Sequence, residues 1–202
     1  MSRVGERLGF TTMALYRHVH SKNELIALMV EEGLGLPRAP DDASLAGWRA
    51  GLERWAWELL AVVRRHPWAL DLPLARLPFG PNRSAWLDHG LGALAETALS
   101  EHEKAALVLL LNDYVFSHAR LDVELGGLGQ AMARANEAAT TQGPLPPELV
   151  AAERFPALHR ALDAGIFDPS ESDRDADFAF GLERILDGIE CLVAERTGGK
   201  RE

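Results

Sequence analysis

The stretch TTMALYRHVHSKNEL, residues 11–25, decides the fold, because it contains two helix starts in close succession. Thr11 belongs to a residue type that caps helix N-termini, and it predicts a short helix that extends to about Val19. Ser21 followed three residues later by Glu24 is a capping box, which predicts the start of a further helix. The stretch therefore predicts two helices joined by a tight turn.

The residues around these caps extend the pattern. Residues 2–9 predict a short preceding helix with its apolar residues on one face, and Gly9 ends it because glycine readily adopts a positive φ. Leu15 and Val19 are four residues apart and are expected to be buried. The chain thus opens with a helix, a glycine turn, a second short helix and a capped third helix.

A stretch rich in prolines and acidic residues, LPRAPDDAS at 36–44, predicts a boundary between two domains. We expect a helix-turn-helix domain over residues 1–35, called the head, and a helical domain over residues 44–197, called the body. Apolar residues of the body recur at helical spacing, and no stretch alternates as a half-buried strand would. The body helices are expected at 44–66, 82–99, 101–125, 156–165 and 173–196, with GGLG at 126–129 interrupting the third. Ser44 and Asp173 are predicted caps of the first and last of these helices, and Ser100 with Glu103 forms a second capping box ahead of the helix at 101–125. The predicted fold class is all-α.

Charge is distributed unevenly along the chain. Residues 1–22 hold four cationic side chains and one acidic one, a net charge of +3, whereas the whole chain carries −9, so the remainder carries −12. A basic head on an acidic body favours contact between the head and an anionic partner. By charge alone, an ordinary solvated surface is the stronger explanation.

Several classes of protein are disfavoured by the composition. A single cysteine, Cys191, excludes an internal disulfide and, with no leader-like start, favours the cytoplasm. The most apolar run, AALVLLL at 105–111, is much shorter than the roughly 20 residues of a membrane-spanning helix, so no membrane partner is expected. No glycine-rich phosphate loop, HExxH or cysteine cluster is present, and we expect no enzyme activity, cofactor or metal.

The run LYRHVHSKNEL at 15–25 resembles the tetracycline-repressor (TetR) family of transcriptional regulators, and VGERLGFTTMA at 4–14 is similar to that family's lead-in. DFAFGLERILDGIE at 177–190 also resembles the last helix of the ligand-binding domain in its tetracycline-repressor subgroup. The resemblance implies a head that reads the major groove of double-stranded DNA with its second helix. Arg17 is expected to act as a base reader or a phosphate clamp, and Lys22 as a phosphate contact. The implied DNA-binding residues are Thr11, Thr12, Met13, Ala14, Tyr16, Arg17, His18 and Lys22.

Family members begin with another helix ahead of the glycine-turn segment, whereas this chain begins at Met1 within the second helix of that scheme. The resemblance therefore predicts a head that is incomplete at its N-terminus. Two functions remain open at this point. One is a ligand-responsive regulator, a repressor released from its operator by a small molecule, and the other is a small-molecule-binding protein of the same fold that no longer binds DNA.

The two longest apolar helices have faces broader than a small intrachain core requires, and the resemblance implies that they pair with a second copy in a homodimer. Ordinary packing within the chain is expected to account for about half of the interface positions named next. The predicted interface residues are Leu110, Tyr114, Leu121, Phe178, Leu182, Ile185, Ile189 and Leu192.

A small-molecule effector is expected inside the body, where apolar walls surround a few polar groups. Asn112 is the strongest indication, because an amide within VLLLNDYVF needs a buried partner or a ligand. Core packing explains the tryptophans equally well, and it explains His118 better. The predicted ligand-binding residues are Trp55, Trp68, Trp86, His89, Asn112, Phe116 and His118.

Overall fold

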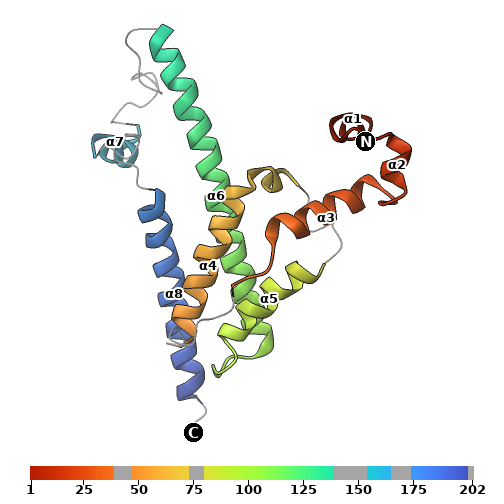
Figure 1. Ribbon diagram of the computed structural model, residues 1–202. Helices are drawn as coiled ribbons and strands as arrows, with labels where there is room; N and C mark the ends of the chain where they lie inside the picture. The colour runs from red at the N-terminus through yellow and green to blue at the C-terminus, as the bar shows by residue number, and fades with distance from the viewer. Residues whose placement is uncertain (39–46, 73–79, 139–153, 165–173, 200–202) are drawn as a thin grey trace. The chain divides into compact units, whose positions relative to one another are not determined.

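The computed structural model describes residues 1–38, 47–72, 80–138, 154–164 and 174–199, and every element in these ranges is a helix (Figure 1). The elements in chain order are α1 (Ser2–Leu8), α2 (Thr12–Tyr16), α3 (Lys22–Leu34), α4 (Trp48–Arg65), the 3₁₀ helix η2 (Pro67–Asp71), α5 (Pro81–Ala93), α6 (Glu101–Ala138), α7 (Pro156–Asp163) and α8 (Arg174–Gly198). The all-α prediction is confirmed.

The chain forms two compact units, which are treated separately below. The first contains Met1–Ala119 and Ile185–Glu202, and the second contains Arg120–Arg184. The first unit therefore holds α1 to α5, the beginning of α6 and the end of α8. The division into a head at 1–35 and a body at 44–197 remains a prediction.

The core of the first unit is built on α4, whose buried residues recur at helical spacing as an amphipathic helix requires. Leu52 and Leu60 of α4 are fully buried, as are Leu94 after α5 and Leu111 of α6. The Trp55 and Trp86 rings meet edge to face, with centroids 6.1 Å apart. Gly90 of α5 permits this packing, because a Cβ there would lie 2.9 Å from Cγ1 of Val108 and 3.3 Å from Nε1 of Trp55. The side chains buried to at least nine-tenths in this unit include Leu52, Trp55, Ala56, Leu59, Leu60, Val62, Val63, Leu70, Trp86, Leu94, Leu99, Val108, Leu111, Val115, Ala119, Leu186 and Ile189.

Polar contacts tie the end of α8 to the rest of the first unit. Arg49 at the start of α4 contacts Asp187 at 2.6 Å and Glu190 at 3.0 Å. Arg196 contacts Glu103 at the start of α6 at 2.7 Å. Local sequence patterns gave no indication of these pairs, because the partners lie far apart in the chain.

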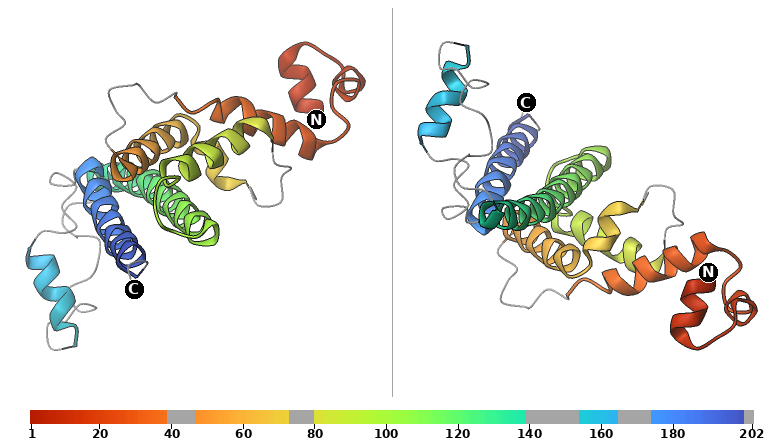
Figure 2. Two further views of the ribbon diagram at one scale, coloured as in Figure 1. Left: turned by 90° about the horizontal axis from the view of Figure 1, so that it is seen from below. Right: turned by 90° about the horizontal axis from the view of Figure 1, so that it is seen from above.

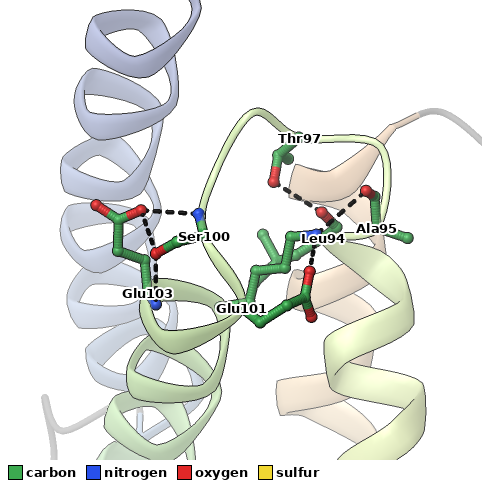
Figure 3. A network of polar contacts seen from close by, with 7 residues as sticks. Leu94, Ala95, Thr97, Ser100, Glu101 and Glu103 are labelled. Atoms are coloured by element: carbon green, nitrogen blue, oxygen red, sulfur yellow. Dashed lines mark hydrogen bonds and ion pairs between the residues drawn. The ribbon is translucent and has the colours of Figure 1, made fainter.

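The predicted capping box at the start of α6 is confirmed (Figure 3). The backbone N–H of Ser100 donates to Oε2 of Glu103 at 2.8 Å, and the N–H of Glu103 donates to Oγ of Ser100 at 3.3 Å. Beside it, the buried Lys104 ammonium donates to Glu101 at 2.7 Å and to the carbonyl of Ala95 at 3.3 Å. The first turn of α6 is therefore capped by Ser100 and Glu103, and the Lys104 ammonium is paired with Glu101.

In the second unit, Phe178 and Leu182 of α8 are buried, and Arg174 donates to the carbonyl of Asp122 at 3.2 Å. Phe180 of the same helix is 64% exposed.

Several predicted helix ends were wrong. The helix α6 continues through the GGLG run to Ala138, because glycine costs a helix only about 1 kcal/mol relative to alanine and the flanking alanine, methionine and glutamate residues favour helix. The helix α5 ends at Ala93 instead of 99, in a turn where Thr97 Oγ1 donates to the carbonyl of Leu94. The helix α2 ends at Tyr16, and Val19 is buried in the turn that follows. The caps predicted at Ser44 and Asp173 lie outside the described residues.

Candidate nucleic-acid interface and ligand site

The turn between α1 and α2 is close-packed. Gly9 ends α1 with a φ of 72°, in the left-handed region that favours glycine. Gly5 lies directly under the turn, since a Cβ at this position would come within 2.6 Å of the carbonyl oxygen of Phe10. This packing holds α1 and α2 in the tight arrangement that the glycine-turn pattern predicted.

The helix α2 begins at the predicted cap. Oγ1 of Thr11 accepts a hydrogen bond from the backbone N–H of Ala14 at 3.1 Å. The hydroxyl proton of Thr11 is not used by this cap, so it can still be donated to a phosphate or base. One residue therefore both starts the helix and remains available on the surface.

The structure exposes most of the predicted DNA-binding side chains. Met13 is 74% exposed and Tyr16 is 43% exposed, whereas Thr12 and Ala14 are half-buried. Lys22 is exposed at the first position of α3, where backbone N–H groups and the helix dipole favour an anion. The exposed members of the predicted set are Thr11, Met13, Tyr16, Arg17, His18 and Lys22.

The capping box predicted at the start of α3 forms only in part. The backbone N–H of Glu24 donates to Oγ of Ser21 at 3.0 Å, as predicted. The Glu24 carboxylate, however, accepts from the backbone N–H of His20 and contacts the His20 ring at 3.0 Å. The His20 backbone N–H is the main reason that the pKa of Glu24 is lowered. Glu24 thus stabilises the turn between α2 and α3.

The other end of α3 contacts α5 and α4. The Glu31 carboxylate accepts from the backbone N–H of Asn82 at 2.7 Å, and the Trp86 indole donates to the carbonyl of Gly35 at 3.0 Å. Sequence reasoning missed Glu31 and Asn82, since the two residues are 51 positions apart and each resembles an ordinary polar surface residue. No local pattern could have identified this pairing.

The predicted ligand-binding residues fall into separate groups. Trp55 and Trp86 pack together, and both indole N–H groups are satisfied, that of Trp55 by the carbonyl of Trp86 at 2.9 Å. Trp68 instead packs edge to face against His66, and the two ring centroids are 6.0 Å apart. His118 pairs with Tyr114 on α6 at 6.2 Å. The tryptophan pair is therefore part of the core.

His89 is the predicted ligand residue with the clearest unsatisfied group. Its side chain is half-buried on α5, and its Nδ1 atom is buried without a hydrogen-bond partner in the described structure. Asn112 and Phe116 are half-buried on α6. Within the part of the chain that the structure describes, no three His, Cys, Asp or Glu side chains form a group that could hold a metal ion.

The eight predicted dimer-interface residues differ in how much of their surface is exposed. Phe178, Leu182 and Ile189 are at most 2% exposed within the chain itself, so they have almost no surface to offer a partner. Leu110 is 50% exposed and Leu121 is 48% exposed. Tyr114, Ile185 and Leu192 are half-buried. These five residues remain a predicted interface.

None of the helices within the described ranges is both long and apolar enough to cross a membrane.

Comparison with known proteins identifies the family. A family model described as the tetracyclin repressor-like C-terminal domain matches residues 37–193. The HTH-type transcriptional repressor DrrR1 of Streptomyces coeruleorubidus is 36% identical over 205 residues, which cover 98% of this chain and 72% of that protein. An HTH-type transcriptional regulator of Saccharopolyspora erythraea is 27% identical over 190 residues, covering 94% and 75% of the two chains.

Solved structures share the fold. The TetR family protein ActR of Streptomyces coelicolor, in complex with actinorhodin, superposes with a TM-score of 0.63 at 24% identity and covers 95% of this chain and 86% of its own. TetR from Acinetobacter baumannii AYE gives a TM-score of 0.55 at 20% identity, covering 94% and 85%. The family model and the 36% identical repressor, taken with the glycine turn and capped α2 described above, show that the chain belongs to the TetR family of transcriptional regulators.

Proposed function

We propose that this chain is a ligand-responsive transcriptional repressor that binds operator DNA as a homodimer and is released by a small molecule. The observation that carries the proposal is the exposure of Met13 and Tyr16 on α2, of Arg17 directly after it and of Lys22 at the start of α3. Side chains of these kinds contact base edges and phosphates in helix-turn-helix complexes. The relative DrrR1, named as a repressor, supports the same function. The proposed action on DNA favours a cytoplasmic location.

The effector is proposed to bind in the body. His89 supports this, because a buried and unpartnered Nδ1 is costly unless a ligand or water satisfies it. One structural neighbour is described in complex with actinorhodin, which shows that a chain of this fold can hold a small molecule. Release then follows from a population shift, in which the effector binds more tightly to a conformation whose heads no longer match the DNA grooves.

Fluorescence anisotropy on the duplex upstream of the chain's own gene tests DNA binding. Each phosphate contact contributes about −0.9 to the slope of log affinity against log salt concentration. We expect Arg17→Ala and Lys22→Ala each to weaken binding, and Lys22→Ala to flatten the slope by about 0.9. Arg65→Ala is the matched control, because it removes an exposed cation at the end of α4, outside the head. If both head variants match this control, the DNA-reading role is wrong, and a small-molecule-binding protein that does not bind DNA becomes the better explanation.

A further inference from the structure

One carboxylate links the C-terminal part of α3 to the start of α5. Glu31 accepts hydrogen bonds from the backbone N–H groups of Asn82 at 2.7 Å and Arg83 at 3.4 Å, while the Asn82 side-chain amide donates to the Glu31 carbonyl at 2.8 Å. The two helices lie side by side in both views of Figure 2, α3 in orange-red and α5 in yellow-green. Glu31 therefore binds α5 through both its side chain and its backbone.

This contact supplies a cap that α5 lacks in its own sequence. The first N–H groups of any α-helix have no partner within the helix, and a negative charge is favourable beside them. The N-cap position of α5 is Gly80, which has no side chain to accept those bonds. The acceptor comes instead from a residue 51 positions earlier, on the helix that follows the DNA-reading α2.

Two further contacts lie beside this cap. The Trp86 indole donates to the Gly35 carbonyl just after α3, and the Trp86 carbonyl accepts from the buried Trp55 indole. Gly33 lies against Trp68 and His66, since a Cβ on it would be 3.2 Å from Cζ2 of Trp68. The C-terminal part of α3 is thus held by α5, by η2 and, through Trp86, by the core.

We propose that Glu31 is a positioning residue for DNA reading: its cap on α5 sets the angle at which α3 leaves the body and so holds α2 in its DNA-binding orientation. The proposal rests on the proposed function, because it gives a role to a head that reads DNA. The geometric part can nevertheless be tested without DNA.

Two variants disturb the cap from opposite sides, one at the carboxylate and one at the N-cap position of α5. Glu31→Gln removes the charge and one of the two acceptor oxygens while keeping the size of the side chain. In Gly80→Ala, the new Cβ would overlap the Glu31 carboxyl group and lie 2.6 Å from Oε1. The backbone of Gly80 is extended, with φ −103° and ψ 178°, so alanine fits it without strain, and the flexible Glu31 side chain must move away. Glu32→Gln is the matched control, an exposed glutamate one position along the same helix.

The readout is a distance between two spin labels, measured by pulsed electron resonance. One label is placed on Cys191, which is exposed on α8, and the other on an introduced Asn23→Cys at the exposed start of α3. Both positions belong to the first unit, and dilution with unlabelled chain suppresses distances between copies. A change in helix content, followed by circular dichroism, would identify a variant that has simply unfolded.

We expect Glu31→Gln and Gly80→Ala to shift or broaden the distance distribution, with helix content unchanged, and Glu32→Gln to match the wild type. If Glu31→Gln unfolds the chain, the label distances in Gly80→Ala alone test the proposal. Distributions like that of the wild type in the folded variants would overturn the proposal.

DNA affinity separates this proposal from the proposed function. If the head reads DNA, a competent orientation reduced to about one-tenth of the population lowers operator affinity about tenfold. The salt slope is expected to stay unchanged, because no phosphate contact is lost. A wild-type chain that binds no DNA would overturn the proposed function, while the label distances would still decide whether Glu31 orients α3.

Discussion

The head and the body are stabilised by different means. In the head, Val19 and Val30 are the buried apolar side chains among the described residues, and Leu8, Phe10 and Met13 are more than half exposed. In the body, α4 alone buries seven residues. Caps, a glycine turn and the attachment to α5 therefore define the head, whereas apolar burial defines the body. The difference teaches that a change in a cap or turn should act mainly on the head, whereas a change in a buried apolar side chain should act on the stability of the body.

The same sequence signal has different consequences in the two regions. Ser21 with Glu24 and Ser100 with Glu103 share the pattern of serine followed three residues later by glutamate. Glu24 contacts its neighbour His20, while Glu103 also binds Arg196 on α8, 93 residues away. The cap in the body is thus part of the tertiary structure, and the cap in the head is local.

The largest effect that tests this contrast is expected from a cavity in the body. Leu60→Ala removes a fully buried side chain and should lower the free energy of unfolding by about 2–5 kcal/mol. Leu28→Ala on α3 removes a side chain that is 52% exposed and should cost less than about 1 kcal/mol. Denaturant unfolding at one fixed protein concentration measures both values. Equal losses would contradict the contrast between the regions.

Two glycines of α5 test how tightly the core is packed, because one lies against core side chains and the other does not. Gly90→Ala forces a Cβ against Val108 and Trp55 and should lower the free energy of unfolding by about 1–3 kcal/mol. Gly92→Ala is its control on the same helix, because nothing lies within 4 Å of its Cβ position. That control should raise stability by roughly 0.5–1 kcal/mol, because alanine favours a helix more than glycine does. If Gly90→Ala leaves the free energy of unfolding unchanged, Val108 and Trp55 can move aside more easily than the close contacts indicate.

The paired serines test whether a cap acts locally or globally. Ser21→Ala and Ser100→Ala each remove an acceptor for the first turn of a helix, a loss of about 1 kcal/mol. For Ser21→Ala we expect faster hydrogen exchange at the first amides of α3, with little change in global unfolding. For Ser100→Ala we expect the whole unfolding transition to shift. The comparison fails if Ser21→Ala shifts the global transition as much as Ser100→Ala does.

The smallest effect is expected in acid. Hydrogen bonds from the Ser100 backbone and from Arg196 lower the pKa of Glu103 from its ordinary value of 4.5 to about 2. The folded chain therefore binds fewer protons than the unfolded chain between these values. This contribution to stability is present above pH 4.5 and is lost as the pH falls towards 2.

Glu103→Gln should accordingly lower the melting temperature at pH 6 more than at pH 3. Added salt should reduce the difference, because the site is open to solvent. Melting curves at the two pH values measure it, with Glu96→Gln, an exposed glutamate in the turn before α6, as the control. An equal loss at both values would exclude the Glu103 charge as the cause.

Local signals predicted much of the fold. Thr11, Ser21 and Ser100 were predicted as helix starts because caps act within three or four residues. The end of α6 was mispredicted, because its glycines lie in a helix that their neighbours favour. The contacts of Glu31 with Asn82 and of Arg49 with Asp187 could not be predicted, because they depend on tertiary packing. For the same reason, the sequence placed Phe178 at an interface although it is buried in the chain.

The helix α3 can also be viewed as a lever arm with its pivot at Glu31. Lys22 lies nine residues from this pivot, about 13 Å along a helix that rises 1.5 Å per residue. Each degree of tilt then moves Lys22 by about 0.2 Å, and a tilt of about 13° displaces it by roughly 3 Å, one hydrogen-bond length. If Lys22 contacts a DNA phosphate as proposed, an effector that tilts α3 by this angle would break that contact, while each contact at Glu31 moves by much less.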